Sequence, residues 1–171
     1  YSENNISARV GKNNTRSGVE FYYSFFNKNV GILKASHLHT AEDLSRGINS
    51  PLPLRIEDFT YDINAPKQQV KHHVAKINYY TYLSNLGKID ISYNYQQNRR
   101  FEFDIRRSNK NSKPSIDLKL DTHVLNLKLT SNISNKLNTK LGFESKYQKN
   151  YANPETGVRR IIPDYTKYDL T

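Results

Sequence analysis

Ile89-Asp90-Ile91-Ser92-Tyr93-Asn94-Tyr95-Gln96 is the stretch that decides the fold, because it alternates strictly between apolar and polar residues. Successive side chains of a β-strand point to opposite faces of the sheet. The alternation therefore predicts a strand with one apolar face and one hydrated face.

Similar alternation extends in both directions along the chain, and helical periodicity is nearly absent. It predicts strands at residues 4–10, 16–26, 30–39, 69–83, 88–101, 116–131 and 136–150. The phase of the alternation slips near Asp121-Thr122-His123, which indicates a bulge or the point where that strand would leave a membrane.

The predicted connections alternate in length. Short turns are expected at 27–29, 84–87 and 132–135, and long loops near 40–67, 102–115 and 151–166. Pro51, Pro53 and Pro66 exclude a central strand from the first long loop. Short turns at one end and long loops at the other are typical of membrane β-barrels. We therefore expect an all-β fold, an antiparallel meander of about 7–8 strands forming part of a transmembrane β-barrel.

The composition agrees with this expectation. Only 36% of the residues are hydrophobic, although the chain contains 13 Tyr and 7 Phe and lacks Trp, Met and Cys. A soluble barrel needs an apolar interior, whereas a membrane barrel keeps a polar one. The net charge of +10 is spread along the chain. This spread indicates solvated faces, or attraction to lipopolysaccharide or an anionic ligand, and we expect no nucleic-acid partner.

Four segments resemble the barrel of TonB-dependent outer-membrane receptors of the Bacteroidetes type. They are His39–Leu44, Pro53–Phe59, Arg99–Arg107 and, most closely, Asn153–Tyr165. The resemblance covers essentially all of residues 1–171 and implies a barrel of about 22 strands. It also implies active uptake of a scarce nutrient, such as an iron chelate (a siderophore or haem), in the outer membrane.

The same resemblance implies that the plug domain and the contact with the TonB complex lie outside this chain. The missing plug, TonB box and C-terminal strand, together with the lack of an initiating Met, lead us to expect a piece of a longer protein. The short connection at 11–15 is expected to face outward and to place the piece near the start of the barrel.

Paired arginines at the predicted outer ends are the candidate ligand-binding residues, because guanidinium groups suit carboxylate and phosphate ligands. They are Arg99, Arg100, Arg106, Arg107, Arg159 and Arg160, and His37 and His39 join them because they share a strand face. Bridging to lipopolysaccharide or to nearby acids is the alternative for the arginines. For the histidines a metal or haem role competes with a place at the membrane rim.

His72 and His73 would point to opposite faces and so could not act together. Glu57, Asp58 and Asp62 read as solvated loop acids, and no motif of a catalytic, metal or cofactor site is present. We expect no enzyme activity, no metal and no cofactor.

Two other functions stay open. The first is a self-contained eight-stranded outer-membrane barrel with a structural or adhesive role, whose ends would pair to close the sheet. The second is a soluble carbohydrate-binding β-sandwich, which would turn its apolar faces inward.

Overall fold

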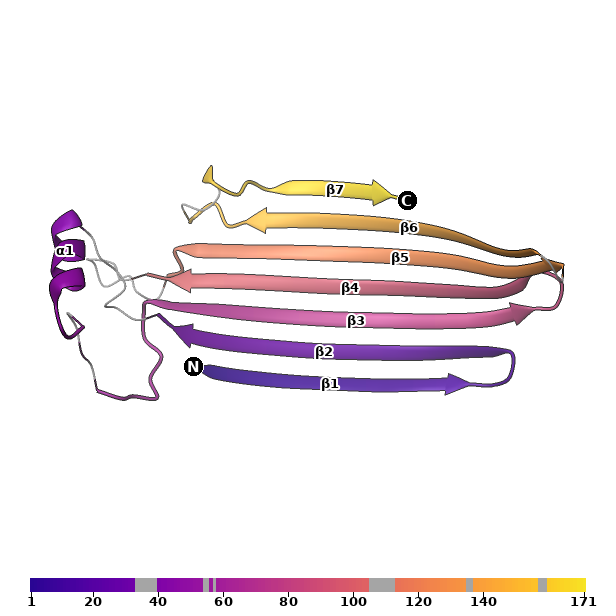
Figure 1. The fold of residues 1–171 in the computed structure, drawn as a ribbon, viewed down its shortest axis with the longest axis horizontal. Helices are drawn as coiled ribbons and strands as arrows, with labels where there is room; N and C mark the ends of the chain where they lie inside the picture. The colour runs from indigo at the N-terminus through magenta and orange to yellow at the C-terminus, as the bar shows by residue number, and fades with distance from the viewer. Residues whose placement is uncertain (33–39, 54–55, 57, 105–112, 135–136, 157–159) are drawn as a thin grey trace.

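The structure is a computed structural model that describes residues 1–32, 40–53, 56, 58–104, 113–134, 137–156 and 160–171. These residues form one seven-stranded antiparallel sheet in which each strand pairs with the next along the chain (Figure 1). The expected all-β antiparallel meander is confirmed. The sheet is open: β1 and β7 are its two edges.

The strands are long, and each begins or ends where the alternating pattern gives way to Asn, Ser, Gly or Pro. Their bounds are β1 Ser2–Asn13, β2 Ser17–Gly31, β3 Lys67–Leu83, β4 Gly87–Phe103, β5 Ile116–Ser134, β6 Leu137–Ala152 and β7 Tyr165–Leu170. The strand that decided the fold, β4, pairs with β3 and β5 along nearly its whole length.

The connections are sorted by length between the two ends of the sheet. Residues 14–16, 84–86 and 135–136 are the short ones, and residues 32–66, 104–115 and 153–164 are the long ones. In Figure 1 the short connections lie at one end and the long ones at the other. We call these the turn end and the loop end.

One predicted turn is wrong. Asn27-Lys28-Asn29 belongs to β2, where the three residues pair with Lys71, Val70 and Gln69 of β3. The ladder on both sides outweighs the local turn preference of Asn, and the predicted strand boundary near residue 30 disappears with it. Residues 33–39 lie outside the described residues.

The first connection is also placed differently from the prediction. Gly11 to Asn13 are part of β1, and the reversal follows at Asn14, whose side-chain oxygen accepts hydrogen bonds from the Arg16 and Ser17 amides. This connection belongs to the turn end, so it does not face outward with the long loops. The expected bulge near Asp121 is absent, since the register there is continuous and shifts only between Asn132 and Ser134.

The first long connection contains a helix that the sequence analysis missed. Helix α1, Ala41–Asn49, begins at Thr40, whose hydroxyl accepts a hydrogen bond of 3.0 Å from the Asp43 amide, and it lies at the loop end (Figure 1). An N-cap of this kind stabilises the start of a helix. Leu44 and Ile48 sit on the helix without cover, and Ile48 is 74% exposed. No helix in the described part of the chain is long and apolar enough to cross a membrane.

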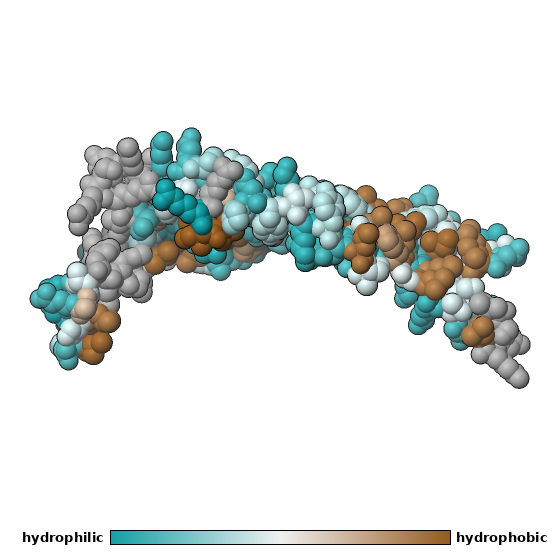
Figure 2. Space-filling view, turned by 90° about the horizontal axis from the view of Figure 1, so that it is seen from above, coloured by the Kyte–Doolittle hydropathy of each residue, from teal (hydrophilic) through white to brown (hydrophobic). Residues whose placement is uncertain are grey.

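The sheet has no apolar interior. Ala152, Pro66 and Gly18 are the only apolar residues that are buried among those described, and none of them has a large side chain. Figure 2, which looks onto the β7 edge, shows a single curved layer with hydrophobic atoms gathered toward the turn end. A second layer, as a β-sandwich requires, is not formed by the described residues.

Candidate functional site

The two faces of the sheet differ in chemistry, and we name them by neighbouring residues of β4. Residues aligned with Ile91 form the Ile91 face, and residues aligned with Ser92 form the Ser92 face. Because every strand keeps register with its neighbours, these faces are continuous from β1 to β6.

The Ile91 face carries an apolar band over its half nearest the turn end. Three register rows make up the band: Ile89, Leu129 and Leu141; Val19, Tyr79, Ile91, Leu127 and Phe143; and Val10, Phe21, Ile77, Tyr93 and Leu125. The rows are uncovered, with Leu127 37% and Phe143 44% exposed. Soluble proteins seldom leave a continuous apolar surface of this size open, so the band indicates a partner surface or lipid.

A row of aromatic and imidazole rings borders the apolar band on the side of the loop end. This aromatic row consists of Tyr23, Tyr95, His123, Tyr147 and Tyr168, which are aligned in register. The rings lie against one another, with centroids 4.9 Å apart for Tyr95 and His123 and 4.9 Å for Tyr147 and Tyr168. The Tyr93 hydroxyl lies 2.7 Å from Nδ1 of His123. Rings with one apolar side and one polar atom suit the boundary between lipid and water.

The apolar band runs diagonally across the sheet. On β1 its member is Val10, which is aligned through the rows with Ser145 of β6. On β6 the band is Leu141 and Phe143, centred at position 142, which is three residues (145 − 142) nearer the turn end. There are five strand-to-strand steps from β1 to β6, so the band drifts by about 0.6 residue per strand (3/5).

Beyond the aromatic row, the Ile91 face carries a closely hydrogen-bonded polar network, together with Phe25, Phe101 and Phe103. The Asp121 carboxylate accepts hydrogen bonds from the Tyr95 hydroxyl at 3.0 Å and from the Gln97 amide at 2.9 Å, and Lys119 Nζ lies 3.2 Å from it. On the next row out, Arg99 donates through Nε and Nη2 to the two oxygens of Asp117, both at 3.1 Å. A bidentate pair of this kind is among the stronger polar contacts in proteins.

The Asp117 carboxylate also connects the sheet to the third long connection. Its side chain is 6% exposed, and Oδ2 accepts a further hydrogen bond of 3.1 Å from the Asn153 side chain. The backbone amide of Asn153 donates a hydrogen bond to the Asp117 carbonyl. The side-chain oxygen of Asn153 accepts a hydrogen bond from the Glu155 amide. This Asx-type turn explains why Asn153 precedes Pro154 in the loop. The cluster therefore fixes the base of the third long connection.

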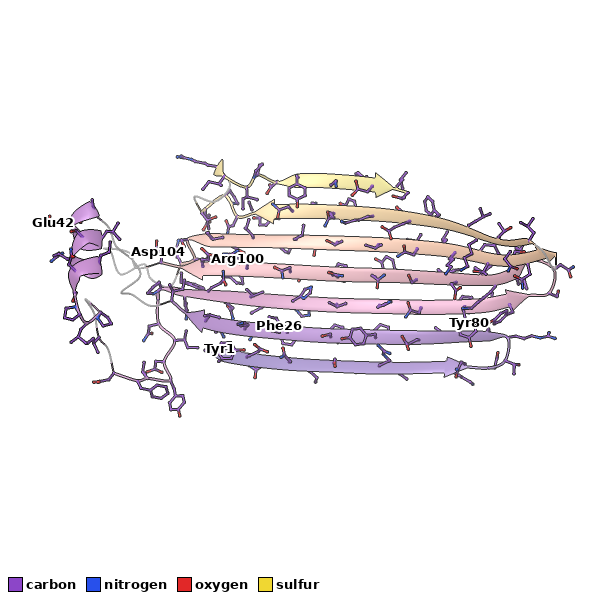
Figure 3. All side chains as sticks on the ribbon, viewed as in Figure 1. Tyr1, Phe26, Glu42, Tyr80, Arg100 and Asp104 are labelled. Atoms are coloured by element: carbon purple, nitrogen blue, oxygen red, sulfur yellow. The ribbon has the colours of Figure 1, made fainter. Side chains whose placement is uncertain are left out.

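The Ser92 face is mainly polar over its half nearest the turn end, whereas Val70, Leu118 and Leu120 lie on the same face nearer the loop end. Glu20 accepts a hydrogen bond of 3.1 Å from Asn78 and lies 3.7 Å from Arg9, and Lys88 pairs with Asp90 at 2.6 Å. Near the turn end the Tyr80 ring lies over Gly18, beside a hollow also lined by Glu20 and Asn78 (Figure 3). A polar face of this kind is the expected lining of a water-filled lumen.

Three of the eight predicted ligand-binding residues are among those described. Arg99 and Arg100 are neighbours on β4, but their side chains point to opposite faces, and each pairs with a carboxylate: Arg99 with Asp117 and Arg100 with Glu102. Figure 3 shows Arg100 at the loop end. Arg160 is exposed within the third long connection. Arg106, Arg107, Arg159, His37 and His39 lie outside the described residues, so the proposed cluster stays a prediction.

The structure places His72 and His73 as the alternation predicts. His73 contacts the Ile91 face, with Nδ1 2.9 Å from the Tyr23 hydroxyl and its ring 4.7 Å from Phe25. His72 aligns with Phe26 and Asn98 of the Ser92 face. Among the described residues, no group of three or more His, Asp or Glu side chains is arranged to hold a metal ion.

Sequence reasoning missed Asp117 and Asn153, the two residues that organise the loop end of the Ile91 face. The available signal was weak: Asp117 is an ordinary polar member of the alternation at the start of β5, and Asn153-Pro154 is a turn initiator. No protein-family model, curated protein or solved structure matches this chain.

Proposed function

We propose that the sheet is part of the wall of an outer-membrane β-barrel, with the Ile91 face toward lipid and the Ser92 face toward a water-filled lumen. The observation that carries this proposal is the uncovered apolar band bordered by the aromatic row. Outer-membrane barrels have an outward apolar band about 25 Å tall with aromatic girdles at its borders. On β3 the distance from the level of the aromatic row, at Ala75, to the end of the strand at Leu83 is eight residues, which at about 3.3 Å per residue is about 26 Å.

The open edges support a larger closed structure. β1 offers the unpaired side of a strand with apolar Ile6, Ala8 and Val10, and an uncovered edge of this length is a site for further strand pairing. In lipid such an edge cannot stay open, because its backbone groups would have no hydrogen-bond partners. In the proposed barrel, additional strands therefore continue from both edges, to about the 22 strands of the large transporters.

We further propose that this barrel is a TonB-dependent receptor for active uptake of a scarce nutrient such as an iron chelate. The support is the resemblance of the outer segments, above all Asn153–Tyr165, to that class of barrel. The long connections gather at one end, where they can meet a ligand from the medium. In this proposal the loops determine which ligand is bound, and partners outside the chain supply the energy for uptake. The ligand is not chemically changed.

The wall proposal is tested with single cysteines, because the chain contains none. Ile91→Cys and Ser92→Cys are a matched pair, adjacent on β4 and on opposite faces. In the full-length protein in native membranes, a nitroxide at position 91 should be relaxed by dissolved oxygen, and one at position 92 by a water-soluble nickel chelate. Equal responses to the two agents at the two positions would overturn the proposal.

The receptor proposal has a separate test. Deleting the gene should slow growth on limiting iron supplied as a chelate, and cells without TonB should show the same defect without an additive effect of the two deletions. Uptake of radiolabelled chelates by the two single mutants and the double mutant measures this directly. Normal uptake of every iron chelate and haem in the deletion strain would remove the iron-receptor function and leave the wall proposal intact.

The two other functions find less support. A self-contained eight-stranded barrel requires its edge strands to pair, and β1 and β7 do not pair in the structure. A carbohydrate-binding sandwich requires a second sheet over the apolar face, and the described residues form one sheet only.

A further inference from the structure

Five cations lie on the Ile91 face beyond the aromatic row in the described strands. One of them, Lys67, is at the start of β3 and donates to the Ile63 carbonyl at 3.1 Å. We call the other four the cation row. Lys71, Arg99 and Lys119 are directly opposite one another on β3, β4 and β5. Lys149 of β6 is diagonal to Lys119, which aligns with Tyr151. Adjacent strands are only about 4.8 Å apart, and like charges directly opposite one another destabilise a sheet. The arrangement therefore needs anions close by.

The carboxylates of this face supply only part of the compensation. Asp117 is bound by Arg99 and Asn153, and Asp121 by Lys119, Tyr95 and Gln97. Within the described ranges, no carboxylate pairs with Lys71 or Lys149. Four cations against two carboxylates leave a net charge of +2 on the cation row, on a face whose other half is apolar.

The distance between the cation row and the apolar band indicates which kind of partner fits this face. Arg99 is four residues beyond Tyr95 of the aromatic row, which is about 13 Å along the strand. The partner must therefore combine acyl chains at the level of the band with anionic groups a short distance beyond the aromatic rings. Arginine and lysine both bind phosphate well, arginine in a bidentate manner.

We propose that the cation row binds the phosphate groups of the phosphorylated glycolipid of the outer leaflet, lipid A, whose acyl chains cover the apolar band. This inference rests on the proposed barrel wall and names the lipid that the wall contacts. In the proposed orientation the cations take the place of divalent ions that otherwise bridge neighbouring lipid phosphates. The side chains of Arg99 and Lys119 remain 44% and 38% exposed, so their outer surfaces are open to such a ligand.

The test uses purified full-length protein in detergent, titrated with diphosphorylated lipid A, with the same lipid after removal of its phosphates, and with inorganic phosphate. The variant Lys71→Gln/Lys149→Gln removes the two cations that have no carboxylate partner among the described residues. The matched control is Lys76→Gln/Lys146→Gln, which removes the same charge from the same strands, β3 and β6, on the Ser92 face. Surface changes of this kind leave folding nearly unaffected.

At about 1 kcal/mol for each cation near a charged membrane surface, removing the two lysines should weaken binding of phosphorylated lipid A about thirtyfold. The control pair should bind as the unmodified protein does, and dephosphorylated lipid A and inorganic phosphate should bind weakly to all three proteins. Equal binding by the two double variants, or equal binding of the two forms of lipid A, would overturn the inference. If that happens while labels at 91 and 92 still report lipid and water, the wall proposal stands and only the glycolipid site fails.

Discussion

Leu127→Arg is the substitution that separates a lipid-facing sheet from a water-facing one most sharply. Leu127 is at the middle of the apolar band, between Ile91 of β4 and Phe143 of β6, and it is 37% exposed. If that face met water, an arginine there would change the free energy of unfolding by no more than about 0.5 kcal/mol. If it faces the middle of a bilayer, the arginine costs about 2–4 kcal/mol. That cost corresponds to a change in the folding equilibrium of about 30-fold to nearly 1,000-fold.

Two control variants locate the effect in space. Asn126→Arg is adjacent on β5 but on the Ser92 face, between Ser92 and Glu144, where we expect almost no change. Gln97→Arg is on the Ile91 face but beyond the aromatic row, where the cost of an arginine falls to about 0–1 kcal/mol.

The measurement is urea-dependent folding of the full-length protein in phospholipid vesicles. The folded fraction is read from the shift in gel mobility between unheated and heated samples. The reasoning would be refuted if Leu127→Arg and Asn126→Arg had the same effect, or if Leu127→Arg were neutral.

Three further predictions concern local contacts. Gly18→Ala should destabilise the turn end by about 1–3 kcal/mol, because its Cβ would lie 2.4 Å from Cε1 of Tyr80. Combining it with Tyr80→Ala in a double-mutant cycle in urea should recover much of that loss, and strictly additive effects would contradict the contact. Arg99→Gln should cost about 1–3 kcal/mol, because the buried Asp117 carboxylate loses its bidentate partner. Adding Asp117→Asn should restore part of the loss in the same assay, and no restoration would count against the pair. Thr40→Ala should reduce the stability of α1 by about 1 kcal/mol. Amide hydrogen exchange in the first turn of α1 should then become roughly fivefold faster, while exchange in β4 stays the same. Unchanged exchange in α1 would rule out the cap.

The sheet could be predicted from the sequence wherever the alternation of apolar and polar residues agrees with the observed strand pairing. The pattern around Ile91 and Ser92 fixed both the strand and its two faces, because a period of two has only one structural interpretation at that length. The prediction failed at Asn27-Lys28-Asn29, where the local turn preference of Asn is real but pairing with β3 outweighs it. It also failed at α1, although Thr40 with Glu42 and Asp43 in the first turn is a recognisable start signal for a helix.

The candidate site was less predictable, because its contacts join residues far apart in the sequence. The sequence marked Arg99 as a ligand-binding residue, yet its partner Asp117 is 18 positions away, and Asn153 is a further 36. Which residues of neighbouring strands are opposite one another depends on register, which a single sequence specifies only through its turns. The cation row illustrates the point, since Lys71, Arg99 and Lys119 look scattered along the chain and become adjacent only in the sheet.

The drift of the apolar band sets how the strands would lean in the proposed barrel. A drift of about 0.6 residue per strand, at about 3.3 Å per residue and a strand spacing of about 4.8 Å, gives an inclination of about 22° from the normal to the layer that the band marks. In a closed barrel a strand with this inclination would occupy about 5.2 Å of the perimeter, whereas an upright strand would occupy about 4.8 Å. The diagonal placement of Val10, Leu141 and Phe143 would therefore widen the opening of the proposed barrel by about 8% for any given number of strands.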